Sequence, residues 1–149
     1  MTRDSQAYPN GTHASSHLAW SELACHDKKR TPYPHHWRMS RAVVLATAFE
    51  MVRAACGDIE LSILSGYRTP AHNKAVGGAL HSQHVEGRAI DIRTPKGLTK
   101  PQFRECIDQA LRAGAPIRGI GSYPWGFHID VRPSPTVVRW AEDRGEDVR

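Results

Sequence analysis

The sequence predicts an α+β fold in which helices pack on a small antiparallel sheet. Two amphipathic helical patterns, near residues 40–57 and 99–114, are separated by strand-like segments and followed by a hairpin pattern. The order helix, strand, loop, strand, helix and hairpin is typical of α+β domains. A chain of 149 residues is long enough for one such domain, and its composition is that of a globular protein.

The N-terminal part of the chain predicts a loop-rich start and then one long helix. Residues 1–16 carry no periodic apolar pattern, so we expect a flexible N-terminal lead-in. Residues 26–37 combine prolines and charges in the manner of a loop. Ser40 is a typical N-cap, and the broad apolar face that follows it predicts a helix ending near Gly57.

The remaining segments predict the sheet and a second helix. Alternation of period two predicts a strand at 88–93, and Thr99 is a typical cap for the helix that follows. The charged residues 141–149 predict a frayed tail, which leaves residues 17–140 as the folded domain. The further elements that we expect are a strand at 61–64, a helical turn at 69–77 and a hairpin of strands 117–121 and 126–131.

Composition and charge exclude several classes of protein. The net charge of +5 is mild, and the lysines and arginines form no stripe interleaved with aromatic residues, so we expect no nucleic-acid partner. The longest strongly apolar stretch, residues 42–49, is far too short to span a bilayer, and residues 1–17 lack the pattern of a secretory signal peptide. We therefore expect a chain that is made in the cytoplasm and does not insert into a membrane. We also expect it to act as a monomer.

The three cysteines form no C-x-x-C pair, which argues against a zinc knuckle or a redox motif. Cys56 and Cys106 lie among apolar neighbours at helical spacing, which favours buried free thiols. A disulfide that involves Cys25 stays open as an alternative.

Two segments carry metal-ligand chemistry on the polar faces of strands. His84 precedes a glycine turn, and Asp91 lies in the next strand on the face opposite its isoleucines. In the last hairpin strand, His128 and Asp130 project from the face opposite the apolar side chains. Two imidazoles and one carboxylate form the ligand set of a catalytic zinc site, which keeps a fourth position open for water. Zinc in such a site polarises a carbonyl and lowers the pKa of its water to about 7, as amide hydrolysis at neutral pH requires.

The segment 82–91 has the sequence SQHVEGRAID, which fits the pattern S-x-H-x-x-G-x-A-x-D. This pattern resembles the signature of the zinc D-alanyl-D-alanine carboxypeptidases and L-alanyl-D-glutamate endopeptidases of bacteria and phages, whose fold the hedgehog signalling domain shares. The runs SGYR at 65–68 and FHID at 127–130 fit in the family's order. The resemblance covers about residues 17–140 and is strongest for the short, single-domain members that phages often encode.

The resemblance implies roles for five residues. His84, Asp91 and His128 would bind zinc, which is the implied cofactor. Arg68 would bind a carboxylate of a peptidoglycan stem peptide through its bidentate guanidinium, and Ser82 would hydrogen-bond the substrate backbone. The alternatives are an Arg68 that only forms a structural salt bridge and a Ser82 that only caps its loop.

One position departs from the family's pattern. Many members place a Glu or Asp three residues before the last histidine ligand, where it acts as general base, and that position is Trp125 here. Asp130 is the candidate catalytic base, because it lies two residues beyond His128 on the same strand face. The alternative is that Asp130 only supports the site. His81 and Glu86 are further candidates, since the loop that carries them can point either way.

These features together predict a zinc peptidase that hydrolyses an amide bond in peptidoglycan stem peptides, by D,D-carboxypeptidase or endopeptidase action. The alternative is a catalytically silent, zinc-containing wall-binding or structural module, in which Trp125 marks the loss of the base. We expect action on the bacterial cell wall. A phage lysis enzyme released through a membrane pore and a virion-borne wall hydrolase both fit this expectation.

Overall fold

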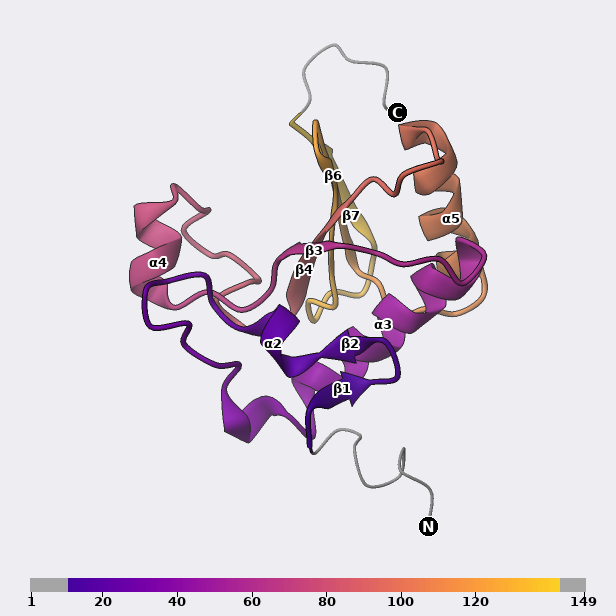
Figure 1. Cartoon of the computed structure of the whole chain (residues 1–149). Coiled ribbons are helices and arrows are strands. Elements are labelled where there is room, and N and C mark those ends of the chain that lie inside the picture. The colour runs from indigo at the N-terminus through magenta and orange to yellow at the C-terminus, as the bar shows by residue number, and fades with distance from the viewer. Residues whose placement is uncertain (1–10, 143–149) are drawn as a thin grey trace.

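The computed structural model describes residues 11–142, and its centre is a five-stranded sheet with helices on both sides (Figure 1). The sheet consists of β3 (Ile63–Ser65), β4 (Ala89–Arg93), β5 (Gly119–Tyr123), β6 (Gly126–Asp130) and β7 (Val138–Ala141). The longer helices are α3 (Arg41–Ala55) and α5 (Lys100–Arg112). The shorter elements are β1 (His13–Ser15), β2 (Leu18–Ala19), α2 (Trp20–Leu23), the 3-10 helix η1 (His35–Trp37) and α4 (Pro70–Ala75).

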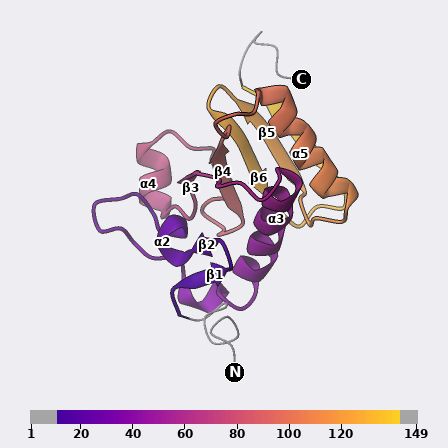
Figure 2. The same cartoon turned by 45° about the vertical axis from the view of Figure 1, so that its right-hand side comes forward.

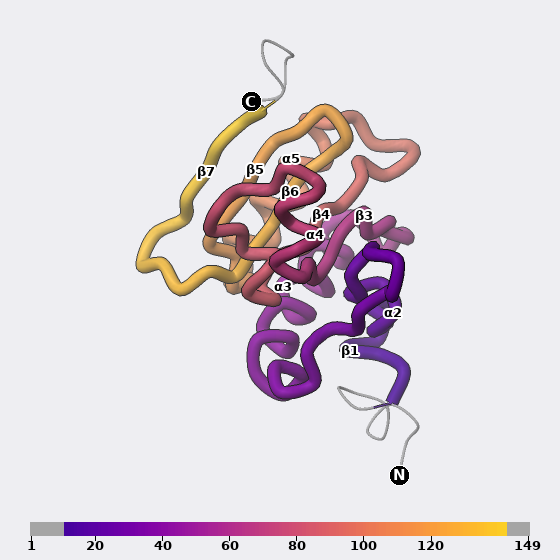
Figure 3. Tube along the Cα trace, turned by 90° about the vertical axis from the view of Figure 1, so that its left-hand side faces the viewer, coloured from indigo at the N-terminus to yellow at the C-terminus, as the bar shows by residue number. Residues whose placement is uncertain are grey.

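The sheet confirms the predicted α+β class and differs from the prediction in one strand pair. Its order is β3-β4-β6-β5-β7, and neighbouring strands are antiparallel except β5 and β7, which are parallel. The sequence analysis does not predict β7, which lies at the edge of the sheet beside β5 (Figure 3). Its residues are exposed or half-buried, so the strand carries no alternation of buried and exposed side chains that a sequence pattern could reveal.

The folded part of the chain begins at an earlier residue than the sequence predicts. Residues 13–15 of the expected flexible lead-in form β1, which pairs with β2, and Ala14 is buried. The Ser15 hydroxyl and the His17 backbone N–H both donate to the Glu50 carboxylate of α3, at 2.6 and 2.8 Å. Such contacts join residues 35 and 33 positions apart, which a local pattern cannot reveal. Residues 1–10 of the expected lead-in lie outside the described residues.

Helices α3 and α5 pack on one another and cover the apolar face of the sheet, whereas α4 lies on the opposite side (Figure 2). Phe103 of α5 contacts Phe127 of β6 edge to face, with ring centroids 5.7 Å apart. The cap predicted at Thr99 is present at the start of α5. It is part of a capping box, because the Thr99 hydroxyl accepts the Gln102 N–H and the Gln102 side chain accepts the Thr99 N–H. Burying each large apolar side chain of this core stabilises the fold by about 1.5–3 kcal/mol. Because the helices cover the apolar face, polar side chains lie on the other face of the sheet.

The predicted C-terminal tail is held by the sheet at its start. Ala141 is the last residue of β7, and the Glu142 N–H donates to the Ser122 carbonyl at 2.8 Å. Residues 143–149 lie outside the described residues. At least the first two residues of the expected tail are therefore part of the fold.

The three cysteines are free thiols, of which Cys25 is buried and Cys56 and Cys106 are half-buried. The structure thus favours the free-thiol interpretation over a disulfide of Cys25. Between residues 11 and 142, none of the helices is both long enough and apolar enough to cross a bilayer.

Candidate metal centre

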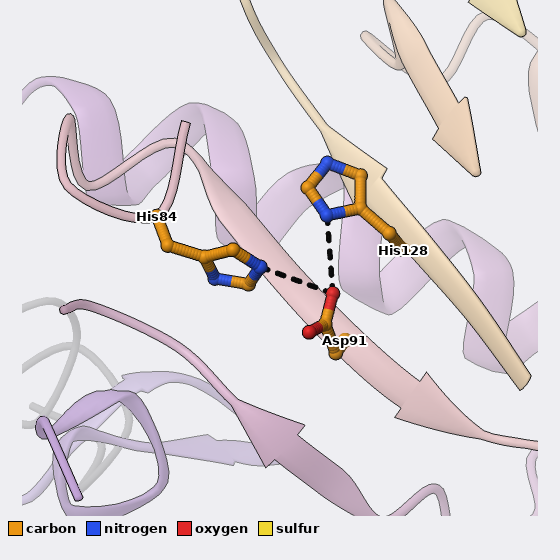
Figure 4. A group of neighbouring side chains, drawn as sticks. All are labelled: His84, Asp91 and His128. Atoms are coloured by element: carbon orange, nitrogen blue, oxygen red, sulfur yellow. Dashed lines mark hydrogen bonds and ion pairs between the residues drawn. The ribbon is translucent and has the colours of Figure 1, made fainter. Parts of the chain in front are cut away.

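Three side chains that the sequence analysis nominates as metal ligands meet on the polar face of the sheet (Figure 4). Asp91 of β4 and His128 of β6 are direct partners across the two strands, and His84 reaches them from the loop before β4. The Asp91 Oδ1 atom lies 3.0 Å from His84 Nε2 and 3.1 Å from His128 Nδ1. All three residues are buried, and their candidate ligand atoms lie within 4.8 Å of one another.

The second nitrogen of each imidazole has its own acceptor. His84 Nδ1 lies 2.7 Å from the Gly66 carbonyl oxygen, and His128 Nε2 lies 2.7 Å from Asp130 Oδ2. If the N–H of each ring is directed to that acceptor when a metal ion binds, His84 Nε2 and His128 Nδ1 are left to bind the ion beside Asp91. Histidine ligands of metals are commonly oriented in this way. The donor set therefore fits a zinc ion with two nitrogen ligands and one oxygen ligand.

The electrostatics of the cluster keep its carboxylate ionised. Burial acts to raise the pKa of Asp91, but the charges and hydrogen bonds of His84 and His128 outweigh it and hold this pKa well below its ordinary value. Burial lowers the pKa of His84. For His128, burial acts in the same direction, but hydrogen bonds to Asp130 and Asp91 raise the pKa above its ordinary value. An ionised carboxylate is the form that a cation requires as ligand.

The loop that carries His84 is fixed by contacts from the N-terminal part of the chain. The buried Tyr33 hydroxyl donates to the Gly87 carbonyl at 2.6 Å, and Arg41 Nη1 donates to the Glu86 carbonyl at 2.8 Å. Gly87 has φ +70°, and a Cβ at this position would lie 2.6 Å from the Trp37 ring. A glycine is therefore required here for both the backbone conformation and the packing.

Asp130 lies behind His128. Its carboxylate is fully buried, accepts both Nε and Nη2 of Arg132 at 2.9 and 2.7 Å, and contacts His128 through Oδ2. A Cβ at Gly119 would lie 2.2 Å from this carboxylate, so the glycine provides the space that Asp130 occupies. The Arg132 contacts hold the pKa of Asp130 well below its ordinary value, although burial acts to raise it.

A cleft of about 840 Å³ opens at the candidate metal centre. Its lining includes all three candidate ligands together with Arg68, Ser82 and the exposed His81. Trp125, at the position of the usual base, also lines it. The lining does not include Asp130 or Glu86, and the Glu86 carboxylate instead pairs with Arg41 at 3.2 Å.

The two predicted substrate-binding residues both lie at the cleft. Arg68 places Nη2 3.6 Å from Asp91 Oδ2, and its other nitrogens contact the Ser65 hydroxyl and the Asn73 side chain at 3.2 Å. The Ser82 hydroxyl oxygen accepts the His84 N–H at 3.1 Å, which leaves its own hydrogen for another acceptor. Each residue thus has a structural contact and also faces the cleft.

Sequence reasoning missed several residues around the centre. Arg132 and Trp140 line the cleft, and Trp140 comes from the unpredicted strand β7. Tyr33 and Arg41 hold the His84 loop from 54 and 45 positions away. The sequence does contain one signal of these large neighbours, the G-I-G run at 119–121. Two glycines on one strand face leave room for large side chains on the adjacent strands.

Comparison with known families adds an independent observation. The sequence model of a family described as peptidase M15 matches residues 12–130, well over half of the chain. The chain belongs to the peptidase M15 family. This assignment confirms the family resemblance found in the sequence. Members of this family are zinc metallopeptidases, and the His-Asp-His cluster of this M15 peptidase is compatible with a bound metal ion. The match starts at β1 and ends with β6, so it includes all three candidate ligands. No curated protein matches the chain significantly.

Proposed function

We propose that this M15 peptidase hydrolyses an amide bond in the stem peptides of bacterial peptidoglycan, with a zinc ion held by His84, Asp91 and His128. The observation that carries the proposal is the meeting of both imidazoles at one Asp91 oxygen beneath an open cleft. A closed structural zinc site would use four protein ligands, whereas three ligands at a cleft leave a position for a reacting group.

The chain's own residues position the ligands and the substrate. Bound zinc supplies a Lewis acid that polarises a carbonyl and acidifies water. The Gly66 carbonyl and the Asp130 carboxylate hold the two imidazoles in the tautomers that zinc requires. The Ser82 hydroxyl, with its oxygen occupied by the His84 N–H, donates its hydrogen to a substrate carbonyl.

Arg68 binds a carboxylate of the stem peptide in this proposal. Its side chain is mostly buried at the cleft, where a planar guanidinium can form two parallel hydrogen bonds to a carboxylate. The ion pair between Arg68 Nη2 and Asp91 Oδ2, at 3.6 Å, also fixes the guanidinium beside the metal centre. The substrate carboxylate and the metal ion would therefore bind at adjacent sites.

Replacing Arg68 by lysine should lower kcat/KM by about 10- to 100-fold, mainly through KM, because an ammonium group cannot reproduce the bidentate contact. Zinc content measured by elemental analysis should stay unchanged. Arg112→Lys is the matched control, since this exposed arginine pairs with Glu105 and lies outside the cleft. Loss of zinc in Arg68→Lys would instead assign Arg68 a purely structural role.

Burial of Asp130 supports an orienting role rather than proton transfer to the substrate. Its carboxylate is shared between His128 and Arg132 and does not line the cleft. The proton acceptor in our proposal is therefore one of the exposed acid-base residues at the cleft, among which residues 11–142 offer His81 and Glu142. The silent wall-binding module remains the competing function, because Trp125 occupies the position of the usual base.

Digestion of peptidoglycan fragments tests the function directly. Zinc-loaded protein would be incubated with muropeptides, and the products analysed by mass spectrometry with a chelator-treated sample as control. We expect either released D-alanine, which indicates carboxypeptidase action, or new amino termini within the stem, which indicate endopeptidase action. Muropeptide binding without any cleavage would contradict the proposal and favour the silent module.

A further inference from the structure

We propose that the Tyr123 hydroxyl is a catalytic hydrogen-bond donor, which binds the carbonyl oxygen of the scissile amide and stabilises the negative charge that develops there. The inference rests on the proposed peptidase function and adds a residue to it. Tyr123 belongs to neither the signature motif nor the predicted site.

The strand register places Tyr123 on the same sheet face as the metal centre. Gly121 of β5 is the direct partner of His128, and Tyr123 lies two residues further along β5. Side chains at i and i+2 of a strand share a face, and so do direct partners on adjacent strands. Tyr123 accordingly lines the same cleft as Asp91 and His128.

Trp140 fixes the Tyr123 hydroxyl in place. Trp140 pairs with Gly121 across β5 and β7, and a Cβ at Gly121 would lie 2.5 Å from the indole, so the indole packs directly over this glycine. The indole Nε1 donates to the Tyr123 hydroxyl oxygen at 2.8 Å. The same indole lies beside His128, with ring centroids 5.1 Å apart, so Trp140 contacts both the Tyr123 hydroxyl and a candidate zinc ligand.

This hydrogen bond determines what the Tyr123 hydroxyl can do. An indole N–H can only donate, so the tyrosine oxygen is the acceptor and its own hydrogen must be directed to a different group. The ring is further held by stacking on Trp125, at 4.8 Å and 8° between the planes. Burial raises the pKa of Tyr123, so the hydroxyl keeps its hydrogen at neutral pH. The result is a neutral donor with a fixed orientation at the cleft.

The proposed contact has a defined place in amide hydrolysis. When the oxygen of water bonds to the carbonyl carbon, the π electron pair moves onto the carbonyl oxygen, and the Tyr123 O–H donates a hydrogen bond to it. When the C–N bond breaks, this pair re-forms the carbonyl, and the two protons of the water move to the leaving nitrogen. The products are a carboxylate and a protonated amine, and Tyr123 is unchanged. A donor prepared in this geometry stabilises the transition state more than the substrate.

Replacing Tyr123 by phenylalanine tests the proposal, because the change removes only the hydroxyl. We expect kcat for stem-peptide cleavage to fall about 100-fold or more, with KM and zinc content nearly unchanged. We also expect Tyr123→Phe to bind a phosphinate pseudopeptide, in which the scissile amide is replaced by a tetrahedral phosphorus group, more weakly by a similar factor in calorimetry. Tyr67→Phe is the matched control, since Tyr67 packs against Tyr33 and Trp37 away from the cleft lining.

A second variant tests the positioning role of Trp140. Trp140→Phe keeps an aromatic ring over Gly121 but removes the N–H that fixes Tyr123. We therefore expect kcat to fall less than in Tyr123→Phe. In the double variant, kcat should be the same as in Tyr123→Phe alone. An active wild-type enzyme with unchanged kcat and phosphinate affinity in Tyr123→Phe would overturn this inference alone. An inactive wild-type enzyme would overturn the proposed function together with it.

Discussion

Replacing His84 and His128 together by alanine should abolish both zinc binding and stem-peptide hydrolysis. The two imidazoles supply two of the three candidate ligand atoms, and the remaining Asp91 carboxylate cannot hold zinc alone at micromolar metal concentrations. We expect zinc by elemental analysis to fall from one ion per chain to none. Cleavage of muropeptides should fall below detection, since the reaction depends on the metal.

A matched double variant controls for the loss of two histidines. His35 and His36 are exposed residues of η1, so His35→Ala with His36→Ala should retain zinc and activity. Circular dichroism of all variants, compared with zinc-free wild-type protein, would separate metal loss from unfolding. A folded His84→Ala, His128→Ala protein that still binds one zinc per chain would show that the ligand assignment is wrong.

Replacing Asp130 by asparagine should weaken zinc binding about 10- to 100-fold, because the carboxylate that orients His128 loses its charge and one of its two acceptor oxygens. Arg132 would lose its ionic partner at the same time. Competition with a chromogenic chelator measures the affinity. Turnover should fall with zinc occupancy and recover largely when the enzyme is saturated with zinc.

The same variant separates the two roles considered for Asp130. A variant that keeps its zinc affinity but loses turnover by about 100-fold would identify Asp130 as the general base and contradict its orienting role. Asp108→Asn is the matched control, because Asp108 pairs with Arg139 away from the metal centre. Neither zinc affinity nor turnover should change in this control.

The candidate ligands could be predicted from sequence because each belongs to a local pattern. Period-two alternation in β4 and β6 identifies the polar face of each strand, and Asp91 and His128 prove to be direct partners across the two strands. Thr99 similarly predicts the start of α5 as its N-cap, and the structure adds a short-range capping box with Gln102. These features depend on neighbours within a few residues, so a sequence pattern contains them.

The residues that sequence reasoning missed act over long separations. Tyr33 fixes the His84 loop from 54 positions away, and Trp140 reaches His128 from a strand whose parallel pairing with β5 no local pattern encodes. The N-terminal strand β1 is a similar case, because its anchor is Glu50 of α3. Arg132 is the exception, because it acts on the carboxylate only two residues earlier, and this contact depends on the conformation of its side chain and not on residue spacing.

The proposed function requires that His84, Asp91 and His128 hold a zinc ion at the base of the cleft. Anomalous diffraction at the zinc absorption edge, from crystals grown with zinc, tests it most directly. We predict one anomalous peak per chain at about 2.0–2.2 Å from three atoms: Nε2 of His84, Nδ1 of His128 and a carboxylate oxygen of Asp91. A peak at any other set of side chains, or coordination through the opposite nitrogen of either histidine, would contradict this ligand assignment.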